Sequence, residues 1–225
     1  MLDPLLPLLK AVLVVPITLL PIINPPSVAP VFLATAGTDD TVIARLARQV
    51  AVNAFFLLAG SMLVGTYVLE FFGVSLPIVR IAGGLLVAAA GWRMLHSGSD
   101  DEVRDAAAKQ TTALSSEQLQ QRSFYPLTFP LMTGPGTIAA AIALGAQIPG
   151  SPILYLAHAA VALIGAAVTA AAIYFSNRYA APLLRRLGPL GTLVMMRLAA
   201  FILLCMGLDI MWAGWLELNA RPRPP

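Results

Sequence analysis

Two short proline motifs interrupt apolar stretches of the chain and are its clearest candidates for binding chemistry. They are Asn24-Pro25-Pro26-Ser27 and Thr133-Gly134-Pro135-Gly136-Thr137. Proline lacks a backbone N–H and disfavours helix in the preceding residue, but it suits the first position of a new helix. Each motif therefore predicts the end of one helix and the start of a half-helix. Asn24 is the expected N-cap before Pro25, and Gly134 has the same place before Pro135.

Half-helices of this kind can bind anions, because their first N–H groups lack intrahelical partners and their N-terminal dipole ends are positive. Glycine at position 136 allows close backbone approach. Two structural proline kinks are the alternative, yet two motifs at matching places favour a substrate site. The predicted substrate-binding residues are Asn24, Pro25, Ser27, Thr133, Gly134, Pro135, Gly136 and Thr137.

A second set of candidates consists of charged and polar residues inside apolar segments. Arg80 and Arg197 lie early in two such segments, and arginine binds carboxylate or phosphate through its bidentate fork. We expect them to gate the site or steer an anion, with structural pairing or snorkelling to the interface as alternatives. Asn53 and Asp209 are candidates for a proton or polar network, although helix–helix hydrogen bonding explains Asn53 well.

The composition shows which elements must position these residues. Of 225 residues, 58% are hydrophobic and 11% are charged, whereas soluble domains carry about 25% charged residues. This excludes a soluble globular enzyme and a disordered chain, and indicates an integral membrane protein. The sequence contains no nucleotide-binding or metal-binding motif. We therefore expect no enzyme activity, no cofactor, no metal and no nucleic-acid partner; the lipid bilayer is the expected surrounding.

Six apolar segments are long enough to be transmembrane candidates. They cover residues 5–36, 43–71, 76–95, 124–146, 153–175 and 190–212. The predicted fold class is an all-α polytopic membrane protein with broken helices in segments 1 and 4. Small residues three and four positions apart in the fifth segment permit close helix packing, within the chain or in a homo-oligomer.

The two halves of the chain resemble each other. The motif around Pro25 aligns with the one around Pro135, and Arg80 aligns with Arg197. A repeat of three spans starts its second copy from the opposite side of the membrane, so the copies must be inverted, as in many secondary transporters. The predicted organisation is a first three-helix repeat over 1–96, a polar linker over 97–123 and a second, inverted repeat over 124–225.

The basic residues predict the orientation. Nine of them fall on the side that holds the loops after segments one, three and five: Arg45, Arg48, Arg93, Arg104, Lys109, Arg122, Arg178, Arg185 and Arg186. Basic residues mark the cytoplasmic side. We therefore predict periplasmic termini and a cytoplasmic linker in a bacterial inner-membrane protein.

At these motifs the chain resembles the MarC family of bacterial inner-membrane proteins, also called the UPF0056 or NAAT group. The resemblance covers nearly the whole chain and rests on the six spans, Asn24-Pro25, Arg80-Ile81-Ala82-Gly83-Gly84 and Gly134-Pro135-Gly136-Thr137-Ile138-Ala139. The family is similar to LysE-type exporters, and some members are regarded as neutral amino-acid transporters. This chain departs from the family where Ala199-Ala200 follows Arg197, a place where the family often has glycine, which puts close helix packing there in doubt.

Three functions fit these observations. The first is a secondary transporter or exporter of a small anionic or zwitterionic solute that bears a carboxylate, such as a neutral amino acid. The second is a translocase of an anionic lipid phosphate, such as an isoprenoid carrier, which would show an apolar lateral opening with arginine inside. The third is a membrane scaffold that docks partners through its linker.

Overall fold

The computed structural model describes residues 5–96, 120–146 and 152–220, all of which lie in helices or short connections. Four helices are long and apolar enough to cross a membrane: α3 (Asp40–Phe71), α4 (Leu76–His96), α8 (Pro152–Arg178) and α9 (Ala180–Ala220). Two bent pairs each provide a further crossing when counted as one span. The structure thus confirms an all-α polytopic membrane protein.

Each bent pair is a helix interrupted at a predicted proline motif. Helix α1 (Leu5–Ile23) meets α2 (Pro25–Ala36) at an angle of 58°. The segment η1 (Ser123–Met132), whose backbone is extended at Tyr125 and Phe129, meets α7 (Pro135–Gly145) at 71°. The second helix of each pair begins with the proline, because proline cannot donate the hydrogen bond that would continue the first helix. The predicted breaks in segments 1 and 4 are therefore confirmed.

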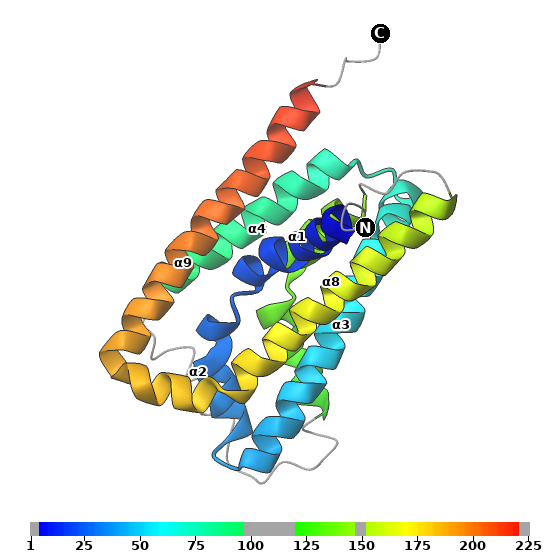
Figure 1. Cartoon of the computed structure of the whole chain (residues 1–225). Coiled ribbons are helices and arrows are strands. Elements are labelled where there is room, and N and C mark those ends of the chain that lie inside the picture. Colours follow the sequence, from blue (N-terminus) through cyan, green and yellow to red (C-terminus); the bar gives the residue numbers. More distant parts are fainter. Residues whose placement is uncertain (1–4, 97–119, 147–151, 221–225) are drawn as a thin grey trace.

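The two halves of the chain pack against each other in a symmetrical way. Helix α3 packs on α8 and α4 packs on α9 (Figure 1). Helix α7 contacts both α3 and α4, and its counterpart α2 contacts both α8 and α9. Exchanging the halves maps each of these contacts onto itself or onto another of them, which is consistent with the predicted inverted repeat. Because the main contacts join one half to the other, the repeats are interleaved.

The pairing of α4 with α9 is antiparallel and close. Gly84 lies against Gly207, while Gly91, further along α4, lies against Ala200, which comes earlier in α9. A Cβ at Gly91 would be 2.5 Å from the backbone nitrogen of Leu204. Close packing is therefore present at Ala200, even though the chain has alanine there, because the glycine of the opposite helix provides the space.

Helix α9 corrects one predicted boundary. The sixth segment was expected over 190–212, but α9 extends from Ala180 to Ala220 and bends at Gly188, whose φ is 67°. Glycine adopts this left-handed conformation without steric cost. The long arm of α9 begins at Pro189. The short arm before the bend runs across one end of the bundle (Figure 1).

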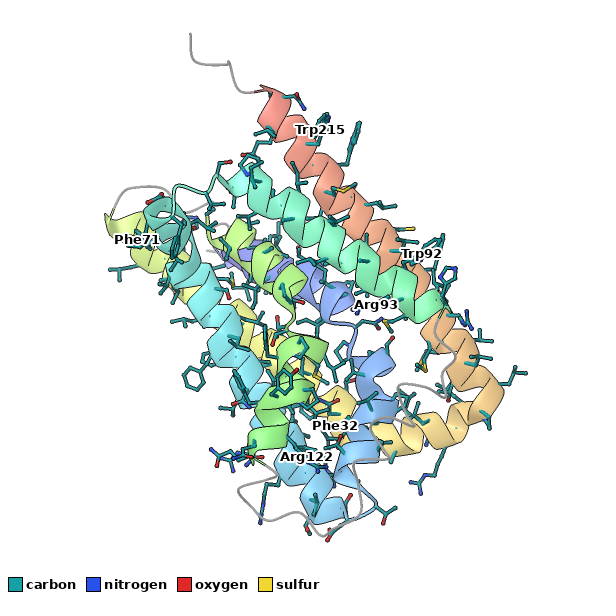
Figure 2. The ribbon with its side chains drawn as sticks, turned by 180° about the vertical axis from the view of Figure 1, so that it is seen from behind. Phe32, Phe71, Trp92, Arg93, Arg122 and Trp215 are labelled. Atoms are coloured by element: carbon teal, nitrogen blue, oxygen red, sulfur yellow. The ribbon has the colours of Figure 1, made fainter. Side chains whose placement is uncertain are left out.

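The two ends of the bundle differ in charge. At one end the carboxylate of Asp40, the first residue of α3, accepts two hydrogen bonds of 2.7 Å from Arg178, the last residue of α8. Two Thr41 donors, the hydroxyl at 2.7 Å and the N–H at 2.8 Å, lower the pKa of neighbouring Asp39. We call this the arginine-rich end; besides Arg178 it includes Arg45 and Arg48 in the first turns of α3, Arg185 and Arg186 in the arm that follows α8, and Arg122, which Figure 2 labels. Which side of the membrane it faces stays a prediction.

The polar linker lies almost wholly outside the described residues, which resume at Gln120. The predicted docking surface for a scaffold, with Arg104 and Lys109, belongs to that stretch. The helical turns that precede Ser123 belong to the fourth segment, which begins a few residues before its predicted start.

Candidate functional site

The two helix breaks face a common cavity in the interior of the bundle. Its volume is about 340 Å³, and both breaks and α4 line it. Six of the eight predicted binding residues contribute to the lining: Asn24, Ser27, Gly134, Pro135, Gly136 and Thr137. Pro25 and Thr133 are buried and are not part of this lining. The structure thus brings together motifs that are about 110 residues apart.

The first break is built around a left-handed residue. Asn24 has φ 48° and ψ 58°, and its N–H donates to the carbonyl of Leu20 at 2.8 Å. Asparagine tolerates this conformation better than most residues. Its side chain makes no capping hydrogen bond, so the expected side-chain N-cap at Asn24 is wrong. Pro25 is the first residue of α2, as predicted.

The first three residues of α2 offer no free amide to an anion. Pro25 and Pro26 have no N–H, and the N–H of Ser27 donates to the carbonyl of Asn24 at 3.0 Å. The expectation that both half-helices supply free N–H groups is therefore wrong for the first break. Its double proline removes the donors that a single proline would leave.

The second break does supply free amides. Gly134 is extended (φ −72°, ψ 176°), and Pro135 starts α7. The N–H of Ile138 donates to the Gly134 carbonyl at 3.0 Å. Gly136 and Thr137 occupy the second and third helical positions, so their N–H groups have no intrahelical acceptor. Both residues line the cavity.

Threonine hydroxyls satisfy the carbonyls around the second break. The Thr133 hydroxyl donates to the carbonyl of Thr128 at 2.9 Å, and the Thr137 hydroxyl donates to that of Met132 at 3.3 Å. Glycine is needed here as well, since a Cβ at position 134 would be 2.7 Å from the Pro130 carbonyl oxygen. The role of Thr133 is therefore to stabilise the break from behind.

Two buried polar atoms in the first break have no hydrogen-bond partner among the described residues. They are Asn24 Nδ2 and Ser27 Oγ. Ser27 is 4% exposed and lines the cavity. An unsatisfied buried polar group costs about 1–3 kcal/mol, so its retention beside a cavity is explained by a ligand or water that completes its hydrogen bonds.

The structure adds Arg93 to the site. This residue lies on α4, lines the cavity and is exposed. Figure 2 shows it where α4 passes the break between α1 and α2, whereas its neighbour Trp92 lies on the outer surface, 56% exposed. In the sequence, Arg93 serves only as one of the basic residues that predict the orientation. On a helix, Arg93 lies on the same face as Leu86 and Ala90, which precede it by seven and three residues. This shared face was the signal that could have identified it.

Comparisons with known proteins agree with this architecture. The family model described as MarC family integral membrane protein matches residues 9–218. A UPF0056 inner membrane protein MarC of Citrobacter koseri is 33% identical over 218 residues, covering 94% of this chain and 96% of the relative. A UPF0056 membrane protein of Archaeoglobus fulgidus is 30% identical over 201 residues, covering 89% and 90%. No solved structure matches.

The chain belongs to the MarC family. It is a multi-pass membrane protein, and several of its bacterial relatives are named inner membrane proteins. The family match covers both helix breaks and the cavity between them.

In this member of the MarC family, the two repeat-matched arginines lie outside the cavity. Arg80 forms a hydrogen-bonded ion pair with Glu217 between α4 and α9. Arg197 donates to the carbonyl of Leu95, again between these two helices. The repeat placed them at matching positions, but those positions face the α4–α9 interface. Gating by Arg80 and Arg197 therefore has no geometric support, and structural pairing describes both better.

The other predicted polar residues of this MarC-family chain are also remote from the cavity. The side-chain amide of Asn53 donates to the Ser123 hydroxyl at 3.3 Å, which joins α3 to η1. Asp209 is exposed on α9. Within the described ranges, no group of three or more His, Cys, Asp or Glu could hold a metal ion.

Proposed function

We propose that this protein is a secondary transporter of a small solute bearing a carboxylate, such as a neutral amino acid. The observation that carries this proposal is the cavity of about 340 Å³ between two helix breaks, with free amides at α7 and unpartnered polar atoms at Asn24 and Ser27. Broken helices that meet at the interface of inverted repeats are the usual binding-site plan of secondary transporters.

The charge of the cavity favours an anionic group. Arg93 is the one charged side chain among the described residues that line it. The first turn of α7 adds two amides and the positive end of the helix dipole. A carboxylate held at α7 is therefore the arrangement with the best electrostatic complementarity.

The packing of the two half-helices supports alternating access. Helix α7 is pressed against α4, since a Cβ at Gly83 would overlap that of Ala139 and a Cβ at Gly136 would overlap Val87. Its counterpart α2 also contacts α9, and a hollow of about 550 Å³ lies between parts of the two helices, with Leu33 and Leu193 in its lining. A rocking motion that closes α2 on α9 and opens α7 from α4 would move the opening of the cavity from one end of the bundle to the other.

We propose that the arginine-rich end faces the cytoplasm, with both termini in the periplasm, because basic residues are retained on the cytoplasmic side. Cysteines introduced at positions 2 and 110 of a Cys205→Ser protein test this with an impermeant thiol reagent in intact cells. Position 2 should react and position 110 should not. Reaction of position 110 alone would reverse the orientation.

Flux in proteoliposomes tests the transport proposal. Vesicles loaded with a neutral amino acid should take up the labelled compound by exchange, and Arg93→Gln should lower that uptake at least about tenfold, because a charge-assisted contact is lost. Arg48→Gln, which likewise removes an exposed arginine but one outside the cavity, is the matched control. If the wild-type protein exchanges no neutral amino acid, this substrate class is wrong.

An anionic lipid phosphate is the second candidate, and a specific observation favours it. Beside Arg93, the cavity wall includes the exposed apolar residues Leu86 (49%) and Leu131 (36%), which fits a lateral opening toward lipid. An assay of undecaprenyl phosphate movement in the same vesicles separates the candidates. Lipid movement without amino-acid exchange would favour the translocase.

A further inference from the structure

We propose that the hollow between α2 and α9 binds an anionic phospholipid of the surrounding bilayer, with the phosphate at Arg185 and an acyl chain between the two helices. This hollow is separate from the cavity between the helix breaks, because the two share no lining residue. The lipid site therefore does not depend on which solute the cavity binds.

The hollow lies at the bend of α9. Helix α2, the short arm of α9 and the long arm of α9 each contribute to its walls, and its apolar side chains include Leu33, Leu184, Leu193 and Met196. Leu193 is 36% exposed, so the hollow reaches the outer surface of the bundle. Its volume of about 550 Å³ falls within the range of about 300–1,000 Å³ that is usual for ligand sites. An apolar hollow that opens on a membrane-facing surface suits an acyl chain.

One arginine supplies the charge of this hollow. Arg185 lines it and is exposed, and it forms no hydrogen bond or ion pair with the residues that the structure describes. Among the described lining residues there is no carboxylate, and Thr192 adds a hydroxyl. A guanidinium can donate two parallel hydrogen bonds to a phosphate. The charge of the hollow is therefore complementary to an anionic headgroup.

The short arm of α9 places Arg185 where headgroups lie. The arm runs across the arginine-rich end of the bundle (Figure 1) and contains no acidic residue. It exposes Leu183 and Leu187 as well as Arg185 and Arg186, a composition typical of a helix that lies in the membrane interface. Arginine side chains there extend to the headgroups, and basic pockets between transmembrane helices bind anionic headgroups.

A lipid in the hollow would oppose the approach of α2 to α9. That approach is the movement that alternating access requires, so this consequence alone rests on the proposed function. Lipid binding is measured without flux. A failure of the lipid site and a failure of transport are therefore separate results.

Lipid titration of the full-length protein in detergent tests the headgroup contact, with native mass spectrometry as the readout. Phosphatidylglycerol should bind more tightly than phosphatidylcholine, and Arg185→Gln should lower the phosphatidylglycerol affinity about fivefold or more, the effect of one arginine near anionic lipid. Arg186→Gln is the matched control, because Arg186 is exposed on the same arm but does not line the hollow. It should leave the affinity nearly unchanged. Equal losses in the two variants, or equal affinity for the two lipids, would overturn the site.

A bulky substitution tests the place of the acyl chain. Leu193→Trp fills the hollow and should lower the phosphatidylglycerol affinity severalfold while Arg185 stays in place. Val194→Trp is the control, because Val194 is 59% exposed and lies outside the hollow. Should Leu193→Trp fail to fold, Leu33→Phe fills the hollow from α2. A folded variant with the hollow filled that binds phosphatidylglycerol as tightly as the wild type contradicts the placement.

Discussion

At the residue scale, two buried polar atoms beside the cavity, Asn24 Nδ2 and Ser27 Oγ, have no hydrogen-bond partner among the described residues. Most buried hydroxyls are satisfied locally: Thr169 donates to the Gly165 carbonyl at 2.8 Å and Thr128 to that of Ser123 at 2.6 Å. Ser27 is buried to a similar degree yet lacks a partner. Thr66 Oγ1 and Asn177 Oδ1 also lack a partner, but Ser27 is the one of these three that lines the cavity, where a bound solute can complete its hydrogen bonds.

Ser27→Ala should therefore separate stability from binding. The variant loses an unpartnered hydroxyl, so its melting temperature in detergent should stay the same or rise slightly. Solute affinity should fall about threefold to tenfold, as one hydrogen bond to the ligand is lost. Thr169→Ala is the control, because it removes a satisfied hydroxyl away from the cavity and should affect stability alone. A marked loss of stability in Ser27→Ala would assign its hydroxyl a structural role.

The ion pair between Arg80 and Glu217 has a structural role in this account. Its side chains are 23% and 32% exposed, so breaking it with Arg80→Gln should lower stability by roughly 1 kcal/mol or less. Solute affinity should be unaffected. The swapped pair Arg80→Glu with Glu217→Arg should recover the stability in thermal unfolding. If Arg80→Gln instead abolished solute binding at normal stability, the arginine would belong to the site after all.

At the element scale, the sequence predicted the helix breaks but not the faces that surround them. Pro25 and Pro135 dictate local backbone geometry, so the two breaks could be placed before any packing was known. Which face of α4 meets the breaks depends on its contacts with α7 and α9, which are far away in the chain. For this reason Arg93 was missed and Arg80 was assigned to the site. The left-handed backbone conformation of Asn24 also depends on the double proline that follows it.

Helix α7 depends on glycine for its packing on α3. A Cβ at Gly145 would overlap the backbone carbonyl of Met62, whereas a Cβ at Gly60 on α3 would meet open space. Gly145→Ala should therefore lower the melting temperature and the flux by forcing α7 away from α3. Gly60→Ala should be neutral or stabilising by up to about 1 kcal/mol, since alanine favours helix over glycine. Equal effects of the two substitutions on thermal unfolding would contradict this close packing.

At the scale of the whole molecule, the predicted inverted repeat implies that two similar half-helices can exchange their packing. Helix α7 is pressed against α4, while a hollow lies between parts of α2 and α9. We propose that the opposite arrangement, in which α2 closes on α9 and α7 opens, is available to the same sequence. Transport follows if the cavity opens at one end of the bundle in the first arrangement and at the opposite end in the second.

A disulfide that holds α2 against α9 across the hollow should stop the exchange between the two packing arrangements. Leu33 and Leu193 both line the hollow, so Leu33→Cys with Leu193→Cys in a Cys205→Ser protein should cross-link when α2 approaches α9. Flux should then fall to background and return after reduction. Each single cysteine variant is the control and should keep its flux under oxidation. Full cross-linking with normal flux would show that the hollow does not change width during transport.

The central claim is that a small carboxylate-bearing solute occupies the cavity between the two helix breaks. Solute protection of a cavity cysteine tests it most directly. Ala90 lines the cavity on α4, while its neighbour Ala89 is exposed and outside it. In a Cys205→Ser protein, a neutral amino acid should slow thiol labelling of Ala90→Cys severalfold and leave that of Ala89→Cys unchanged. Equal labelling of Ala90→Cys with and without saturating solute, in a variant that still transports it, would contradict the claim.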